Sequence, residues 1–370
     1  MTFRGWLLDL YLNQEEGLTL WFIGEDDRRV CFKQAFPVTF YVAGSSEQLR
    51  ALWKRVRGSP GVLGLSRKQK QDVFVADPVD VMQIDMVSPD SQLRLFRDIE
   101  AKFPDLTYYD ADVTIGTRYM ARHGVFPLAL CELEVDENQL IQSIRPLNTR
   151  WDLIPNLPPL RIFELKPDCD PNRGKVRSLL MRTDRFAQHI PLDPAGEYLR
   201  LINEALATYD PDIFVTDWGD SWLIPFLNAQ SAEKGIPLQL NRDATRPVRW
   251  QKETTYFSYG HIIYRPEEAH LFGRCHVDRK SSMMWSDYSL AGTLEMARVT
   301  TLPIEKAARV SPGQGISAMQ VITALEKDVL VPYQKRQVEE FKSGMQLIQS
   351  DRGGMVYQPK VGLHMDVAQV

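Results

Sequence analysis

A short apolar strand carries the first charged side chains that could take part in chemistry. Residues 162–166 read Ile-Phe-Glu-Leu-Lys, and the period of two in a strand places Glu164 and Lys166 on the same face. Hydrolysis of a phosphodiester by two metal ions needs several carboxylates that converge on ions about 4 Å apart, often beginning with an Asp-x-Glu pair on such a strand. Glu164 could ligate a metal here, whereas the ammonium group of Lys166 would repel one.

Two further carboxylates, Asp217 and Asp220, flank a Gly turn after a second apolar strand. One interpretation is a residual cation site that they form with Glu164, to which Asp278 could add a ligand. The alternative is that Asp220 or Ser221 caps the following helix, because such side chains accept hydrogen bonds from the first free N–H groups of a helix. The pattern favours the helix cap.

Residues 309–315 (RVSPGQG) combine an arginine, a serine and small residues between two helical segments. Free backbone N–H groups, a hydroxyl and a guanidinium could together hold a phosphate in such a loop. A plain turn between two helices, punctuated by Pro and Gly, explains the same residues. A phosphate site and a structural turn therefore both remain open.

The elements that position these residues change in kind along the chain. Residues 1–145 alternate apolar and polar residues in short segments bounded by Gly, Asp or Pro, which predicts an α+β domain rich in antiparallel sheet. Residues 146–159 (PLNTRWDLIPNLPP) are a Pro-rich connector. Strands alternate with helices in residues 160–300, which is typical of an α/β domain. Residues 301–370 are predicted to be mainly helical.

The composition is that of a globular protein. With 370 residues, 42.5 kDa and 44% hydrophobic residues, the chain can form two or three cores. The net charge of −4 excludes a strongly basic nucleic-acid-binding protein, although residues 241–370 are mildly basic. No apolar run of transmembrane length and no signal-peptide pattern occurs, so we expect a cytoplasmic protein. Four scattered cysteines predict free thiols, and His276 is expected to be a packed strand residue.

The final residues, 351–370 (DRGGMVYQPKVGLHMDVAQV), contain a polar Gly turn, a short apolar run and a second turn at Gly362. Met365, Val367 and Val370 then alternate with polar residues, as at the start of a buried strand. A fraying C-terminal tail is the plain explanation. The alternation instead favours a strand that a further segment, in the same chain or another, completes.

Together these segments resemble the N-terminal half of a family B DNA polymerase. Residues 109–113 (YDADV), followed by RYM and HG, are similar to the family's YxADI…RF…HG segment. Residues 211–227 (PDIFVTDWGDSWLIPFL) stand where the family has PDIITGYNxxxFDxPYL. Residues 351–370 match the lead-in to the first polymerase motif, and their RGG…P..GLH…V run is the most specific part. In the family, the metal-binding Asp of the palm would follow the position of Val370.

The resemblance implies a β-rich N-terminal domain, a ribonuclease H-like (DnaQ-like) exonuclease fold and a helical segment leading into the palm. It also reveals departures from the exonuclease motifs. Glu164 stands where the family has Asp, Lys166 where it has Glu, Trp218 where it has Asn, and Leu223 where it has a metal-binding Asp. No Tyr-x-x-x-Asp is found for the third motif. The resemblance therefore implies inactive proofreading, as in a prokaryotic subgroup with degenerate exonuclease motifs.

By this resemblance, the complete enzyme would be a DNA-directed DNA polymerase that serves replication or repair. It would extend a primer 3′ end with deoxynucleotides, using two Mg²⁺ ions in a palm. This chain would bind primer–template DNA, with Arg309, Ser311, Gln314 and Lys335 as expected phosphate contacts. Its expected partners are DNA and a second polypeptide that carries palm and thumb; no membrane is expected.

Two alternatives to this role remain open. A surviving nuclease would use Glu164, Asp217 and Asp220 with Mg²⁺ or Mn²⁺, and Asp278 could add a further ligand. It would remove 3′ nucleotides from single-stranded DNA, and the substitution Glu164→Gln would abolish this activity. A catalytically inert protein, either half of a split polymerase or a truncated product, would have no reaction of its own. Primer extension that requires co-purification with a palm-bearing partner would identify the split enzyme.

Overall fold

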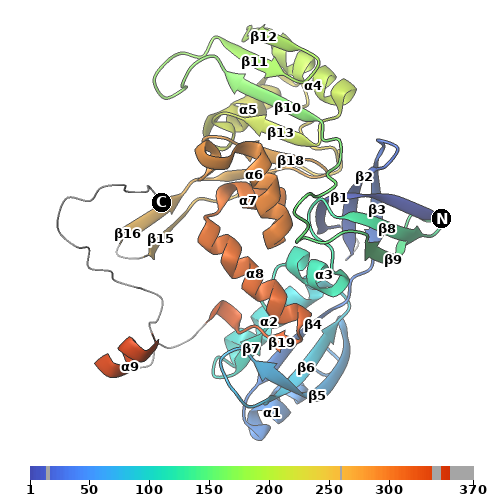
Figure 1. Cartoon of the computed structure of the whole chain (residues 1–370), viewed down its shortest axis with the longest axis vertical. Helices are drawn as coiled ribbons and strands as arrows, with labels where there is room; N and C mark the ends of the chain where they lie inside the picture. Colours follow the sequence, from blue (N-terminus) through green and yellow to red (C-terminus); the bar gives the residue numbers. More distant parts are fainter. Residues whose placement is uncertain (14–16, 259–260, 336–342, 351–370) are drawn as a thin grey trace, which may run out of the picture. The chain divides into compact units, whose positions relative to one another are not determined.

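The computed structural model describes residues 1–13, 17–258, 261–335 and 343–350 (Figure 1). Residues 1–333 form one compact unit and residues 334–370 a second. In the second unit, the helix α9 (Gly344–Ser350) is described. Residues 351–370, which the sequence predicts to begin a buried strand, lie outside the described residues.

The first sheet of the larger unit is fully antiparallel, with the order β3-β2-β1-β8-β9. Its strands are β1 (Thr2–Leu12), β2 (Leu18–Gly24), β3 (Arg29–Gln34), β8 (Leu130–Val135) and β9 (Ile141–Pro146). β1, β2 and β3 are among the alternating segments on which the prediction of an antiparallel domain rested. The sheet confirms that prediction.

A second sheet, with the order β19-β5-β6-β4-β7, follows in the same part of the chain. Its strands are β4 (Val38–Ala43), β5 (Val62–Asp72), β6 (Val79–Met86), β7 (Thr107–Tyr109) and β19 (Val329–Leu330). Three helices accompany it: α1 (Ser46–Val56), α2 (Pro89–Lys102) and α3 (Ile115–His123). Side chains from both sheets and these helices share one core, which includes Phe22, Phe40 and Tyr119.

The third sheet has the order β12-β11-β10-β13-β18. Its strands are β10 (Ile162–Pro167), β11 (Ser178–Arg182), β12 (Ala187–Pro191), β13 (Ile213–Thr216) and β18 (Cys275–Asp278). β10, β11 and β12 pair antiparallel, whereas β13 runs parallel to both β10 and β18. Three helical segments follow its strands: α4 (Glu197–Tyr209), the π-helical turn η1 (Gly219–Leu223) and α5 (Ile224–Lys234). The predicted alternation of strands and helices holds from α4 through β13 to α5, whereas β10, β11 and β12 follow one another without a helix between them.

Two hairpin-like pairs and three further helices complete the larger unit. The pairs are β14 (Arg249–Gln251) with β17 (Glu268–His270), and β15 (Thr254–Ser258) with β16 (His261–Arg265). The helices are α6 (Trp285–Thr300), α7 (Ile304–Arg309) and α8 (Pro312–Glu326), followed by the short turn η2 (Tyr333–Lys335). Apolar side chains of α6 and α7 pack on β13 and β18, and Leu8 and Ile23 of the first sheet join this core.

The structure differs from the predicted elements in two places. The segment predicted to be mainly helical contributes β19, whose two residues are too few for alternation to reveal a strand. The predicted small-residue loop at residues 309–315 is largely helical, because α8 already begins at Pro312. Ser311 caps α8 and Pro312 occupies its first turn, where its missing N–H has no cost. The predicted loop was therefore wrong in its extent.

None of the helices in the described part of the chain combines the length and the apolar character needed to cross a bilayer. All four cysteines are free thiols, as predicted.

Candidate functional site

Three of the four carboxylates singled out in the sequence, Glu164, Asp217 and Asp278, lie at or near one edge of the third sheet. β10, β13 and β18 run parallel, so their carboxyl ends meet at the same edge, where open α/β sheets place ligands. Asp217 directly follows β13, and Asp278 is the last residue of β18. Glu164 lies within β10, two residues before Lys166 and opposite Val215 of β13.

Arginine side chains bind two of these carboxylates, Glu164 and Asp217. Arg279 donates from Nε to Oδ1 of Asp217 at 2.5 Å and from Nη1 to Oε2 of Glu164 at 3.2 Å. Arg182, the cross-strand partner of Glu164, donates from Nη2 to both of its carboxylate oxygens, at 2.6 and 2.8 Å. The side chains of Glu164, Asp217 and Arg279 are 19%, 17% and 18% exposed, so solvent screens the two ion pairs of Arg279 less than pairs on the open surface.

These residues do not fit a site for two divalent cations. Guanidinium groups already occupy both oxygens of Glu164, and Leu223, which stands for a metal-binding Asp in the resemblance, is fully buried in an apolar core. Within the described ranges, no group of three or more His, Cys, Asp or Glu side chains is placed to hold a metal ion. The predicted cation site of Glu164, Asp217 and Asp220 is thus not assembled among them.

Trp218, the other departure from the exonuclease motifs, lies beside this edge. Its backbone has a positive φ of 54°, and the ammonium group of Lys280 lies 4.8 Å from the centroid of its ring. This distance permits a cation–π interaction. A pocket of about 290 Å³ lies beside Glu164, and it is lined by Leu160, Ile162, Glu164, Arg182, Thr183, Asp184 and Tyr209.

The side chain of Asp220 lies in the interior, although its backbone N–H donates to Oδ2 of Asp278 at 3.2 Å. It is 1% exposed, and its oxygens accept hydrogen bonds from Nε and Nη2 of Arg309, both at 3.0 Å. Arg309 also donates to the carbonyl oxygens of Glu305 and His276, at 2.8 and 3.2 Å. The helix cap that the sequence favoured is wrong, because α5 begins without a side-chain cap. Asp220 does not face a cation site either, because its carboxylate is paired with Arg309. His276 is fully buried in β18, as predicted.

The same interior holds a second histidine between two carboxylates. His270 lies 2.8 Å from Glu305 and 3.2 Å from Glu268. Glu305 also accepts the backbone N–H groups of Leu271 and His276, so it ties α7 to the turn between β17 and β18. Burial alone would lower the pKa of His270, but the hydrogen bonds to Glu268 and Glu305 outweigh it and raise the pKa above its ordinary 6.5.

We expect this histidine to make stability depend on pH. Because its pKa is raised in the folded protein, its contribution is fully present below pH 6.5, about the pKa of an unfolded histidine, and is lost as pH rises through the folded pKa. The difference in unfolding midpoint between wild type and His270→Gln should therefore be largest below pH 6.5 and shrink above it. Midpoints from denaturant titrations between pH 5.5 and 8.5 measure this difference. A difference that grows as pH rises would contradict the assignment.

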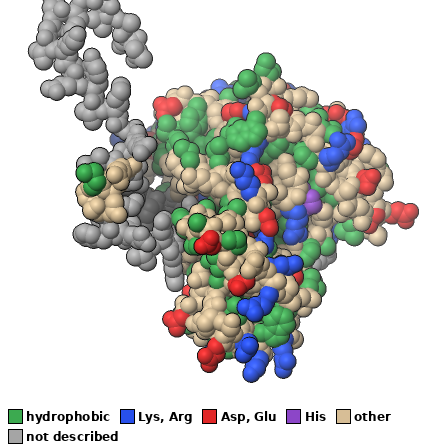
Figure 2. Space-filling view, turned by 60° about the horizontal axis from the view of Figure 1, so that its bottom comes forward, with side chains coloured by type: hydrophobic (Ala, Val, Ile, Leu, Met, Phe, Trp, Pro, Cys, Tyr) green, Lys and Arg blue, Asp and Glu red, His purple; other side chains and the backbone are tan. Residues whose placement is uncertain are grey.

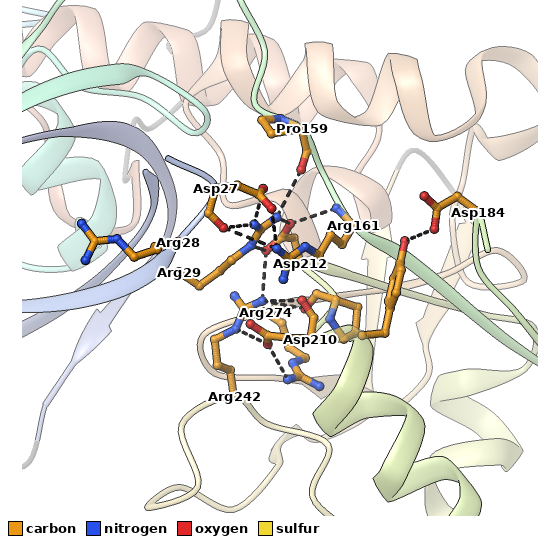
Figure 3. Close-up of polar contacts among 12 residues, drawn as sticks. Asp27, Arg28, Arg29, Pro159, Arg161, Asp184, Asp210, Asp212, Arg242 and Arg274 are labelled. Carbon is orange, nitrogen blue, oxygen red and sulfur yellow. Dashed lines mark hydrogen bonds and ion pairs between the residues drawn. The ribbon is translucent and has the colours of Figure 1, made fainter. Parts of the chain in front are cut away.

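A cluster around Asp212 joins the first sheet to the third (Figure 3). Asp212 is fully buried and accepts hydrogen bonds from Arg29 at 2.6 and 3.1 Å and from Arg242 at 3.0 Å. It also accepts the backbone N–H of Arg161 at 2.9 Å. Beside it, burial, and then the charge of Arg242, lowers the pKa of Arg274 to about 10. Arg29 belongs to β3, so Asp212 fixes β13 to the first sheet.

The four expected phosphate contacts fall in different environments. Arg309 is 7% exposed and paired with Asp220, a placement that does not favour contact with DNA. Ser311 and Gln314 form a capping box at the start of α8, and Gln314 is exposed. Lys335 ends η2, and its side chain lies outside the described part of the chain. We therefore assign Arg309 a structural role.

The sequence did not single out Arg182 or Arg279. Arg182 could have been found from strand pairing, because it is the cross-strand partner of Glu164. Arg279 directly follows β18, and its N–H donates to the carbonyl of Thr216 at 2.9 Å, which sets it beside the end of β13. A contact between residues 62 positions apart, Asp217 and Arg279, leaves no local pattern in the sequence.

Comparisons with known proteins bear on the fold. No family model matches the sequence, and no curated protein matches it. Among solved structures, the chain is similar to the family B DNA polymerase from the hyperthermophilic archaeon Pyrobaculum calidifontis, with a TM-score of 0.65 and 18% sequence identity. The match covers 92% of this chain and 52% of that chain, so this chain spans about half the length of the structure that it matches. The chain therefore has a family B DNA polymerase-like fold over most of its length.

Proposed function

We propose that this chain is the N-terminal and exonuclease-like part of a family B DNA polymerase and binds primer–template DNA. The fold likeness, with its TM-score of 0.65 over 92% of the chain, is the observation that carries this proposal. The order of the third sheet supports the finer assignment of a ribonuclease H-like fold to residues 160–300. In that sheet the first three strands along the chain are antiparallel, and the last two run parallel to the first.

The proposal includes the loss of proofreading. Three features support it: arginines occupy Glu164 and Asp217, Lys166 replaces a carboxylate, and Leu223 is buried in the core. Hydrolysis of the 3′ nucleotide by two metal ions requires carboxylates that are free to bind them. The surviving-nuclease alternative has no comparable support.

The nuclease assay has a definite expected outcome. Single-stranded DNA labelled at its 5′ end should keep its 3′ nucleotides when incubated with the protein and Mg²⁺ or Mn²⁺. Steady loss of 3′ nucleotides that Glu164→Gln abolishes would establish the nuclease instead. The same assay with Arg182→Met checks for a contaminating enzyme, since a contaminant would be indifferent to both substitutions.

The mixed charge of the surface suits DNA binding through a few individual side chains rather than through a large basic patch. On the face shown in Figure 2, acidic and basic side chains are interspersed. We propose Ser311 and Gln314, at the N-terminus of α8, and Lys335 as phosphate contacts. A phosphate accepts hydrogen bonds at such a helix end, and each lysine–phosphate contact adds about one unit to the salt dependence of binding.

Binding to a labelled primer–template, followed by fluorescence anisotropy at several salt concentrations, tests these contacts. We expect Lys335→Ala to weaken binding equally across DNA sequences and to reduce the slope of log K against log salt by about 1. Lys54→Ala, which removes an exposed lysine from α1, is the matched control and should leave the slope unchanged. Wild-type protein that binds no primer–template at low salt would overturn the proposal.

The reaction of the whole polymerase is a further part of the proposal. A segment equivalent to the half of the Pyrobaculum polymerase that this chain does not match would have to supply the palm and thumb, with Mg²⁺ bound by the palm. The palm would lie on a polypeptide segment that accompanies this chain in the prokaryotic cytoplasm, where the polymerase serves replication or repair. Primer extension by this chain together with a palm-bearing polypeptide, and by neither alone, is the expected result.

A further inference from the structure

The carboxyl edge of the third sheet needs positive charge, whatever the chain's function. Glu164 and Asp217 are both more than four-fifths buried; Glu164 lies on β10, and Asp217 directly follows the neighbouring parallel strand β13. Two partly desolvated carboxylates repel each other and lose solvation, so each requires a cation or hydrogen-bond donors. In sites lined by carboxylates at such an edge, divalent cations commonly meet this requirement.

Two arginines meet this requirement here, and one of them serves both carboxylates. Arg279 contacts both carboxylates, at 2.5 Å to Asp217 and 3.2 Å to Glu164, so it bridges β10 and the end of β13. The side chain of Arg279 is itself only 18% exposed. Its own backbone is fixed, because its N–H donates to the carbonyl of Thr216 at the end of β13. The guanidinium is thus held in place by the strand ends that it joins.

Arg182 contributes differently. It contacts Glu164 alone, and its side chain is 51% exposed. An ion pair of this kind is screened by water and contributes little to stability. Of the two arginines, only Arg279 links two carboxylates from different segments in a partly buried position.

We propose that Arg279 is a built-in counter-cation that replaces a divalent metal ion at this edge of the sheet. It makes the exonuclease-like domain independent of metal ions for its structure, and it blocks Glu164 and Asp217 as metal ligands. Both carboxylates are hard oxygen ligands of the kind that Mg²⁺ and Mn²⁺ prefer. Removal of Arg279 therefore opens a site for one divalent cation between them, because Arg182, the remaining partner of Glu164, is half exposed and forms a weak ion pair that a divalent cation displaces. This inference concerns the edge itself and does not require that the chain binds DNA.

The test compares Mn²⁺ binding and thermal stability in wild type and Arg279→Met, both as the full chain. Bound Mn²⁺ is counted by electron paramagnetic resonance, in which free Mn²⁺ gives the signal. We expect one more bound Mn²⁺ per chain in Arg279→Met than in wild type. We also expect the variant's unfolding midpoint to lie below that of wild type without metal and to rise by about 2–4 °C in millimolar Mn²⁺. The wild-type midpoint should not respond to Mn²⁺ or to a chelator.

Three further variants separate the proposal from its rivals. Arg279→Lys keeps a cation and should neither gain a Mn²⁺ ion nor lose most of its stability, which also covers the case in which Arg279→Met fails to fold. Arg182→Met leaves the bridge intact and should behave as wild type. Arg279→Met combined with Glu164→Gln should lose the additional Mn²⁺ ion.

Two outcomes would overturn the proposal. One is an Arg279→Met variant that binds no additional Mn²⁺ while remaining folded. The other is a wild-type unfolding midpoint that rises with Mn²⁺, together with a Glu164→Gln variant in which this rise is absent. The carboxylates would then be free to bind Mn²⁺ in the presence of Arg279. Neither result bears on primer–template binding, which is measured separately, so failure here and failure of the proposed function are distinguishable.

Discussion

Replacing Asp212 with Asn is expected to lower the free energy of unfolding by about 3 kcal/mol, because it removes the fully buried carboxylate that two buried guanidinium groups share and leaves them only the more exposed Asp27 and Asp210. Asp212 has no exposed surface, and the side chains of Arg29 and Arg242 that it binds are 3% and 7% exposed. Asn keeps the size of the side chain, so the effect measures charge rather than a cavity. Equilibrium unfolding in urea, followed by fluorescence, gives the value.

The same substitution should loosen the junction between the first and third sheets. Arg29 also donates to the carbonyl of Pro159, and Asp212 accepts the N–H of Arg161. The Arg29–Asp212 ion pair therefore holds the end of the connector in place through both of its members. Trypsin should therefore cleave after Arg161 faster in Asp212→Asn than in wild type. Asp26→Asn, which removes an exposed partner of Arg28, is the matched control and should change neither measurement. An Asp212→Asn variant as stable as wild type would show that the cluster does not fix the sheets.

Sequence reasoning identified the fold where the periodicity was strong. Alternation in β4 and helical spacing in α1 and α2 follow from one buried face, which is a local property of the sequence. β5 was missed, because its central residues, Ser-Arg-Lys-Gln-Lys-Gln, are polar throughout, and this strand exists through pairing with β6. Pairing of this kind depends on distant residues, which no local pattern contains.

The sequence predicted the candidate site only as a set of residues that differ from the exonuclease motifs of the family. The sequence showed that Lys166, Trp218 and Leu223 stand where the family has Glu, Asn and Asp, and the structure places Leu223 in a core. It could not show that Arg279 would bridge Glu164 and Asp217. The role of a charged residue depends on which opposite charge it meets, and a charge has no periodicity that reveals its partner. The same holds for Arg309, whose burial against Asp220 joins α7 to η1.

Replacing Arg309 with Met should also destabilise the protein by about 3–5 kcal/mol. Burial alone would raise the pKa of Asp220, but the charge of Arg309, and then that of His276, holds it below its ordinary 3.8. Asp220 therefore contributes stability at pH values above 3.8, and this contribution is lost as pH falls through its lowered pKa. Without Arg309, the Asp220 carboxylate stays buried with His276 as its remaining charged neighbour, so its pKa should rise. Protonation then relieves the cost of burying the charge, so the loss of unfolding free energy in Arg309→Met should shrink as pH falls. Urea unfolding at several pH values measures this.

A double-mutant cycle separates this pair from a phosphate contact. Because replacing both members of a buried pair is often close to neutral, Asp220→Asn combined with Arg309→Met should be more stable than the sum of the single substitutions predicts. Arg309→Met should bind primer–template DNA as tightly as wild type at a temperature where both are folded, since its guanidinium is 3% exposed and bound to Asp220. The opposite pair of results, unchanged stability with weakened binding of DNA, would return Arg309 to the phosphate contacts that the sequence first indicated. Measured together, stability and DNA affinity assign this residue to one role.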